Sequence, residues 1–175
     1  MGLTMIKVYL AGKIPKGDEI GQLEDWRAEL ERQLAATERF EFLSPEDPTL
    51  DEAEPRIVFG HDCYLVSRCD ILLVNAPEKL GVGTAQEMVI AKYMRKHVYT
   101  ILPRDTHHRR TNLNMHGRIV ADWVHPFIYA MSDAIFESPR DFTDFTAKHP
   151  TDLLDLPKKS LSEIDGAVAA YLQTQ

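Results

Sequence analysis

The length and composition of the chain are those of a folded, water-soluble protein. It has 175 residues, of which 44% are hydrophobic and 27% are charged, and this length suits one domain with a real core. We therefore expect a single domain over residues 1–175. The formal net charge of −7 argues against binding to polymeric nucleic acid, because that requires cationic side chains that neutralise phosphates.

Targeting and metal-binding signals do not stand out. The sequence does not begin with the pattern of a secretory signal, and no apolar run is long enough to span a bilayer. Cys63 and Cys69 are the only cysteines, which is too few for a disulfide framework or a zinc site. We expect a cytoplasmic protein without metal, cofactor or membrane contact.

Apolar periodicity predicts alternating strands and helices in the first hundred residues. Short apolar runs predict strands, and apolar residues at steps of three and four, such as Trp26, Leu30 and Leu34, predict amphipathic helices. The predicted strands span residues 6–11, 40–43, 70–75 and 98–102, and the predicted helices span residues 20–34, 57–68 and 84–96. Because the connections are long enough for crossovers, we expect an α/β fold with a parallel sheet and helices on both faces.

The pattern is weaker after residue 102. Residues 104–110 read RDTHHRR, a polar loop whose Arg104, Arg109 and Arg110 either bind a phosphate or form an ordinary solvated charge run. Residues 117–129 are compatible with a helix, and residues 134–136 with a last short strand. Ser160 and Glu163 have the spacing of a capping box, so we expect the chain to end on a helix.

Three segments fall at the carboxyl ends of the predicted strands, where ligands bind in open α/β sheets. The first is Tyr9 to Gly12, the second begins at Asn75, and the third is the turn that contains Gly81 and Gly83. Glycines allow a backbone to approach a ligand closely. The helix N-terminus that follows the turn offers free N–H groups and a positive dipole end.

Glu87 follows this glycine turn. We expect it in the first turn of the helix, where the dipole favours the ionised form, so that it acts as a carboxylate nucleophile or base. An acidic residue at such a place is equally what helix electrostatics favour without any catalytic role. From spacing alone, both interpretations stay open.

Two aspartates precede the turn. Asp62 is an acid on a predicted helix whose other residues are mostly apolar, so it has a partner, a catalytic task or a surface position. Asp70 starts the next strand, at the end of the sheet opposite the expected cleft, which indicates a structural role.

Four blocks of sequence occur in a characteristic order between residues 5 and 116. They are Tyr9-Leu10-Ala11-Gly12, the pair Asp62 and Asp70 eight residues apart, the turn from Gly83-Thr84 to Glu87, and Asn112-Leu113 with Asn114 directly after. In this order and spacing the chain resembles the nucleoside 2-deoxyribosyltransferase family, which includes 2'-deoxynucleoside 5'-monophosphate N-hydrolases and CMP N-glycosidases.

The resemblance implies a flavodoxin/Rossmann-like sheet of about five strands in a homodimer or larger homo-oligomer with shared active sites. It implies that Glu87 is the nucleophile that attacks C1' of the sugar, that Tyr9 positions this carboxylate, and that Asp62 contacts the nucleobase. Asn112 or Asn114 would reach the neighbouring subunit's site near the sugar 5' end. The remaining residues expected at the substrate are Gly12, Gly81 and Gly83.

The predicted activity is cleavage or transfer at the N-glycosidic bond of a (deoxy)nucleoside or nucleotide through a covalent glycosyl-enzyme. Serines typical of phosphate-specific members are missing, so an uncharged nucleoside is favoured over a 5'-monophosphate. One alternative is a phosphoribohydrolase of the cytokinin-activating type, although the turn from Gly81 to Thr84 lacks one of that family's glycines. Another is a nucleotide sensor without turnover.

Overall fold

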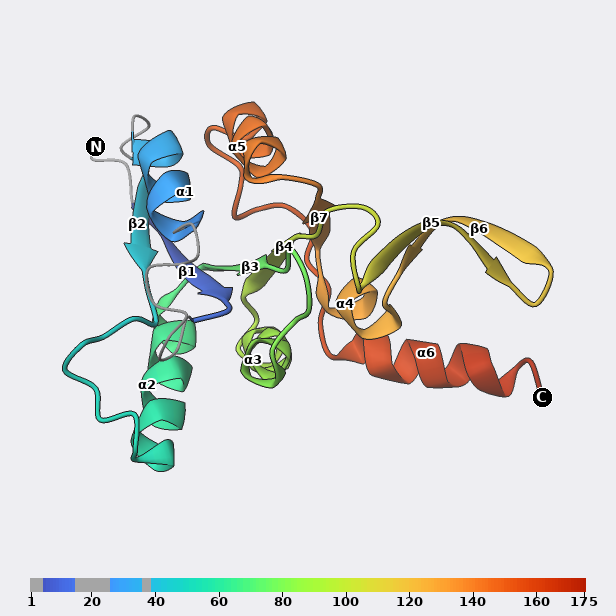
Figure 1. The fold of residues 1–175 in the computed structure, drawn as a ribbon, viewed down its shortest axis with the longest axis horizontal. Helices are drawn as coiled ribbons and strands as arrows, with labels where there is room; N and C mark the ends of the chain where they lie inside the picture. Colours follow the sequence, from blue (N-terminus) through green and yellow to red (C-terminus); the bar gives the residue numbers. More distant parts are fainter. Residues whose placement is uncertain (1–4, 15–25, 36–38) are drawn as a thin grey trace.

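A parallel five-stranded sheet forms the centre of the protein (Figure 1). The computed structural model describes residues 5–14, 26–35 and 39–175. The strand order is β2-β1-β3-β4-β7, and every neighbouring pair is parallel. This is the doubly wound order of flavodoxin-like folds, and it confirms the predicted fold class. The strands are β1 (Ile6–Gly12), β2 (Phe40–Leu43), β3 (Ile71–Asn75), β4 (His97–Ile101) and β7 (Ala134–Phe136).

Helices cover both faces of this sheet, as predicted (Figure 1). Every residue of β3 and of β4 is buried, which explains why the sequence of β3 is a nearly continuous apolar run. The first face is covered by α1 (Trp26–Ala35) and α5 (Pro139–Lys148), and the second by α2 (Pro55–Arg68), α3 (Val82–Tyr93) and α4 (Pro126–Met131). The part of the predicted first helix that precedes Trp26 lies outside the described residues.

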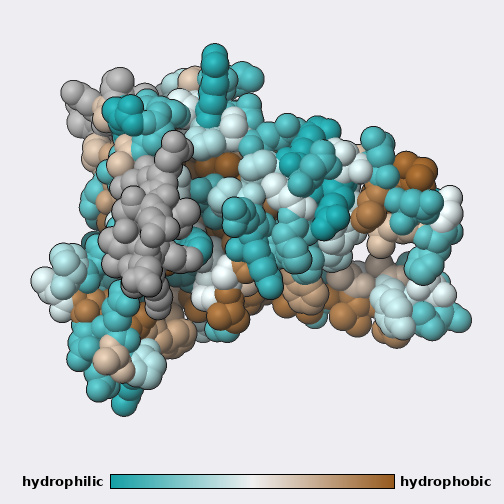
Figure 2. Space-filling view, in the orientation of Figure 1, coloured by the Kyte–Doolittle hydropathy of each residue, from teal (hydrophilic) through white to brown (hydrophobic). Residues whose placement is uncertain are grey.

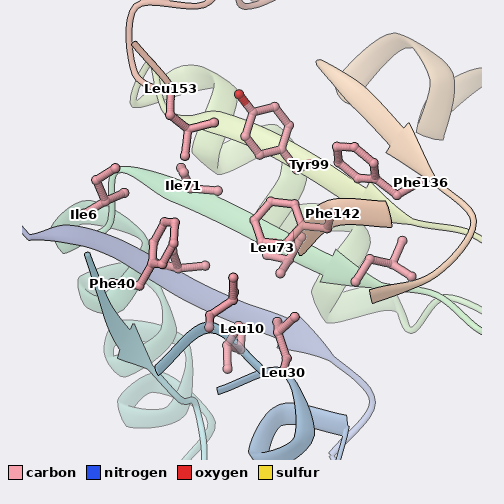
Figure 3. Close-up of a cluster of buried hydrophobic side chains, with 13 residues drawn as sticks. Ile6, Leu10, Leu30, Phe40, Ile71, Leu73, Tyr99, Phe136, Phe142 and Leu153 are labelled. Atoms are coloured by element: carbon pink, nitrogen blue, oxygen red, sulfur yellow. The ribbon is translucent and has the colours of Figure 1, made fainter. Parts of the chain in front are cut away.

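Each face has its own apolar core. In the first, shown in Figure 3, Leu10, Leu73 and Tyr99 of the sheet and Phe142 of α5 belong to one cluster of buried side chains. In the second, alternate residues of the same strands, such as Tyr9 and Leu72, pack against α2, α3 and α4. Side chains alternate between the faces of a strand, so Tyr9 points to the face that carries α3.

The prediction of a helix over residues 117–129 is wrong. Most of this segment belongs to an antiparallel hairpin of β5 (Arg109–Met115) and β6 (Arg118–Val124), and helix α4 starts only at Pro126. The hairpin turn places His116 and Gly117 at φ values of 53° and 85°, a conformation that glycine adopts without strain. The hairpin also takes in Arg109 and Arg110, which we expected in a polar loop.

The final predicted helix is present as α6 (Ser162–Leu172), although its start differs from a capping box. The Ser160 hydroxyl accepts a hydrogen bond from the Ser162 N–H, and the helix has no side-chain cap. No residue of α6 is buried. It extends away from the sheet in the same direction as the β5–β6 hairpin in the view of Figure 1. Its exposed apolar side chains are Ile164, Val168, Tyr171 and Leu172.

Apolar surface also lies along the lower edge of the molecule in the view of Figure 2, where α3, α4 and α6 are found. Val82 on α3 and Phe127 on α4 are among the most exposed large apolar side chains there, at 78% and 77%. In the described part of the chain, no helix combines the length and the apolarity needed to cross a membrane.

A buried ion pair joins α3 to the sheet. Lys92, near the end of α3, places its Nζ 2.6 Å from Oδ2 of Asp133, and both side chains are buried. The same carboxylate accepts hydrogen bonds from the Val98 N–H at 2.8 Å and the Lys159 N–H at 2.6 Å. Burial lowers the pKa of Lys92, and the contact with Asp133 opposes this shift. The carboxylate therefore connects α3, β4, the start of β7 and the segment before α6.

We expect Asp133→Ala to lower the free energy of unfolding by about 3–5 kcal/mol, because it leaves the Lys92 ammonium buried without its counterion. Urea unfolding measures this loss. The matched control is Asp144→Ala, which removes an exposed contact with Arg140 and should cost at most about 1 kcal/mol. Equal losses in the two variants would contradict the assignment.

Candidate active site

The site begins with a hydrogen bond between β1 and α3. The hydroxyl of Tyr9 donates to Oε1 of Glu87 at 2.7 Å. Tyr9 is fully buried and Glu87 is half-buried. Residues 78 positions apart in the sequence thus meet at the second face of the sheet, where Tyr9 lies in the middle of β1 beside Leu72 of β3.

The surroundings of this pair oppose each other in their effect on the Glu87 carboxylate. Burial raises the pKa of Glu87, and the nearby Asp62 adds to this increase. The Tyr9 hydroxyl and the more distant Arg27 lower the pKa again. Burial and the Glu87 charge raise the pKa of Tyr9 far above its ordinary value, so the tyrosine stays a hydrogen-bond donor at any ordinary pH.

The expected place of Glu87 in the first helical turn is wrong. Helix α3 begins at Val82, with Gly81 as its N-cap residue, so Glu87 lies in the second turn. The reason is that Gly83 adopts helical geometry and becomes part of the helix. The favourable field of a helix N-terminus falls off within the first turn, so the Tyr9 hydroxyl is the closer source of stabilisation for a Glu87 carboxylate.

Asp62 approaches this pair from α2. Its carboxylate is near enough to raise the pKa values of both Glu87 and Tyr9. Its Oδ1 lies 3.1 Å from Nδ1 of His61. Burial raises the pKa of the half-buried Cys63 thiol, and the charges of Asp62 and Glu87 raise this pKa further. Two carboxyl groups and a tyrosine therefore gather on one side of α3.

Asp70 is separate from this group. Its carboxylate accepts a hydrogen bond from the Lys7 N–H at 2.9 Å, at the start of β1. That position is at the amino end of the sheet, as expected for a structural residue.

The glycines of the predicted site differ in their surroundings. A Cβ atom on Gly81 or on Gly83 would meet no atom within 4 Å. A Cβ on Gly12 would lie 3.1 Å from the Trp26 ring and 3.2 Å from the Asn75 carbonyl oxygen. Gly12 therefore serves close packing, whereas the space beside Gly81 and Gly83 is open to a ligand.

Arg27 on α1 is a residue of this region that the sequence pattern did not reveal. Its buried guanidinium donates to the carbonyl oxygens of Leu10 at 3.2 Å and Gly12 at 3.2 Å, and pairs with Glu46 at 3.1 Å. It thus holds the carboxyl end of β1 and brings positive charge toward Glu87. Its partners are mainly backbone carbonyls, which leave no signal in a sequence.

Asn112 and Asn114 are not brought to Glu87 within the chain. Both are exposed residues of β5, on the hairpin that projects from the sheet (Figure 1). Asn114 accepts a hydrogen bond from the Gly117 N–H across the hairpin turn at 2.9 Å. Asn112 has a positive φ of 49°, which asparagine tolerates better than most residues.

The arginines of residues 104–110 are largely engaged by carboxylates. The buried Arg109 forms a two-pronged ion pair with Asp122, at 2.8 and 2.6 Å, and donates to the Leu102 carbonyl oxygen. Arg104 pairs with Glu137. Arg109 therefore holds the base of the hairpin, and of the two interpretations of this loop the structure favours neither a phosphate site nor a fully solvated run.

A cavity of about 790 Å³ lies on the other side of α3 from Glu87. Gly81, Val82 and Ala85 of α3 line it, opposite Phe127 and Ile128 of α4. Glu87, Tyr9 and Asp62 are not part of its wall.

The described residues contain no group of three or more histidine, cysteine, aspartate or glutamate side chains arranged to hold a metal ion. What the geometry offers is a half-buried carboxylate with a tyrosine donor, a second carboxylate nearby, and open space at a glycine turn. Such a set suits a carboxylate that attacks or deprotonates a small molecule.

The fold is shared with solved structures of two 2-deoxyribosyltransferases and a CMP N-glycosidase. A 2-desoxiribosyltransferase from Leishmania mexicana is similar over 83% of this chain and 99% of its own, with a TM-score of 0.61 and 14% identity. A 2-deoxyribosyltransferase from Bacillus psychrosaccharolyticus is similar over 88% of this chain and 98% of its own, with a TM-score of 0.55 and 20% identity. A CMP N-glycosidase of Clostridium botulinum is similar over 82% of this chain and 98% of its own, with a TM-score of 0.51 and 15% identity.

No protein-family model matches the sequence, and a search of curated protein sequences finds no match. The support for the resemblance that the four sequence blocks indicate comes from the fold shared with these solved structures. At these identities the likeness concerns the architecture.

We expect Tyr9→Phe to raise the pKa of Glu87 by about one pH unit, because a hydrogen bond to a charged group stabilises the carboxylate. A carbon-13 NMR titration of the Glu87 carboxyl measures the shift. Tyr64→Phe, which changes an exposed tyrosine on α2, is the control and should leave the titration unchanged. An unchanged Glu87 titration in Tyr9→Phe would show that the hydrogen bond does not set the carboxylate's charge.

Proposed function

We propose that the protein cleaves or transfers the N-glycosidic bond of a nucleoside, with Glu87 as a carboxylate nucleophile. The observation that carries the proposal is the 2.7 Å hydrogen bond from the Tyr9 hydroxyl to Glu87, beside a glycine turn with open space. The likeness in fold to two 2-deoxyribosyltransferases and a CMP N-glycosidase supports the same class of reaction.

The chemistry follows from these residue types. Cleavage at C1' passes through an oxocarbenium-like transition state, which a carboxylate below the sugar ring can trap as a glycosyl-enzyme. The Tyr9 hydroxyl orients the carboxylate and keeps it charged. As the bond from C1' to the base breaks, the base takes up a proton or a hydrogen bond, which is the role we assign to Asp62 or to a water that it holds. Water then releases the sugar, or a second base accepts it.

An uncharged nucleoside fits this site better than its 5'-monophosphate. Arg109 is committed to Asp122 and to the Leu102 carbonyl oxygen, and Arg104 is paired with Glu137. An arginine already engaged in a buried ion pair is a poor partner for a substrate phosphate, since releasing it leaves a carboxylate unpaired.

We expect Glu87→Gln to lower base release by roughly a thousandfold or more, because the amide cannot form the glycosyl-enzyme. The assay is chromatographic detection of free base from deoxynucleosides, ribonucleosides and their 5'-monophosphates, with and without an acceptor base. Gln86→Ala, an exposed neighbour on the same helix, should retain full activity. Near-normal base release by Glu87→Gln would exclude Glu87 as the nucleophile. Binding of a nucleotide by the wild type without any release of base would favour a sensor.

Gly83→Ala separates a binding role of the glycine turn from a structural one. Because Gly83 is helical and its added methyl group meets no protein atom, we expect the free energy of unfolding to rise by about 0.5–1 kcal/mol. The same methyl group occupies the space reserved for substrate, so KM should rise. Gly60→Ala on α2, which is also uncrowded, is the control that should gain stability without a change in KM. Unchanged KM in Gly83→Ala would exclude a close approach of substrate.

We further propose that the active form is a homo-oligomer in which the β5–β6 hairpin completes a neighbour's site. This is supported by the exposed position of Asn112 and Asn114 on a projecting hairpin and by the uncovered apolar side chains of α6. A hairpin that cannot reach its own Glu87 can do so only between copies.

Mixing tests this arrangement directly. We expect Glu87→Gln and Asn112→Ala to be inactive alone, and their mixture to regain activity through hybrid oligomers in which one site has both wild-type residues. Sedimentation measures the size of the species. A fully active monomer would contradict the proposal.

A further inference from the structure

A single side chain holds the backbone of the glycine turn from outside. The Leu80 N–H donates to Nε2 of His108 at 2.9 Å. Leu80 directly precedes Gly81, the N-cap residue of α3, which has no side-chain cap. Within the part of the chain that the structure describes, no other backbone N–H of residues 77–81 donates a hydrogen bond to the rest of the protein.

The contact defines the protonation state of the histidine. Nε2 accepts a hydrogen bond, so in the neutral ring the proton must be on Nδ1. Nδ1 of His108 is buried and has no hydrogen-bond partner among the described residues. The contact with Leu80 is therefore the polar interaction that orients this ring, and a protonated imidazole, which has no free lone pair, cannot make it.

The histidine is itself on a rigid base. Its carbonyl oxygen accepts the His125 N–H at 2.8 Å, where the hairpin segment enters and leaves the sheet. Its ring packs edge-to-face on His107 and His125, with centroids 4.6 and 5.4 Å apart. The next residue, Arg109, is anchored by its ion pair with Asp122. These contacts connect the hairpin base to Leu80 and the turn.

We infer that His108 is a positioning residue for the glycine turn, and that protonation of its ring releases Leu80 and uncouples the turn from the hairpin. The consequence for turnover rests on the proposed function, whereas the hydrogen bond and its release do not. The device keeps the turn in place when the ring is neutral and loosens it in acid.

The charged groups around the ring favour the neutral form. Burial lowers the pKa of His108 below its ordinary value of 6.5, and the neighbouring His107, His125 and Lys79 lower it further. Lys13 and Glu78 line the same cavity as His108. The coupling is therefore present above the ordinary histidine range and is lost as the pH falls below it.

Proton–nitrogen NMR of the Leu80 amide tests the inference without reference to activity. In the wild type, the amide proton resonance should move upfield as the pH falls, in step with the titration of the His108 ring. In His108→Gln, whose amide oxygen can accept the Leu80 N–H but does not titrate, the resonance should stay constant. His107→Gln is the matched control, in which the titration of Leu80 should persist.

Activity provides the second readout. On the substrate identified in the base-release assay, His108→Leu should lower kcat/KM roughly three- to tenfold, the range for one neutral hydrogen bond, mainly through KM. His108→Gln should restore kcat/KM. Its kcat/KM should no longer fall in acid through protonation of His108, but should still fall through protonation of Glu87. The inference would be overturned by a Leu80 amide resonance that does not follow the titration of His108, or by wild-type kinetics in His108→Leu. Neither result bears on the role of Glu87, which the Glu87→Gln variant tests separately.

Discussion

The buried carboxylate of Asp133 is the interaction on which the arrangement of the second face depends. It neutralises Lys92 at the end of α3, and its remaining lone pairs take backbone N–H groups of Val98 and Lys159. A buried ion pair is favourable only when such additional hydrogen bonds satisfy it. With α3 fixed at this end, Glu87 on its second turn reaches the hydroxyl of Tyr9.

The candidate site combines two opposing requirements on one carboxylate. Exclusion of water makes a carboxylate a stronger nucleophile and a better partner for a developing positive charge, but it also favours the protonated, inactive form. The structure balances these effects with the Tyr9 hydroxyl at 2.7 Å and with the charge of Arg27, against the opposing charge of Asp62. Arg27 reaches this place because the carbonyl oxygens at the end of β1 hold its guanidinium.

Sequence patterns predicted the parts of the fold that depend on burial alone. β3 is buried along its whole length, so its apolar run was unambiguous, and the spacing around Tyr9 and Glu87 pointed to two residues that do meet. Patterns failed where a residue's partners lie elsewhere in the chain. The start of α3 was misplaced because Gly83 is tolerated in a helix. The segment of β6 was read as part of a helix because its hairpin is held by the buried ion pair of Arg109 rather than by an apolar face.

The closure of the hairpin segment at one point has a consequence for how such a protein can diverge. The His125 N–H binds the carbonyl oxygen of His108 at 2.8 Å, so the chain leaves the sheet and returns to it through a narrow neck. The entropy of closing a loop changes only slowly with its length. Insertions or deletions beyond this neck therefore leave β4 and β7 undisturbed, and evolution can vary the reach of the hairpin separately from the sheet that supports it.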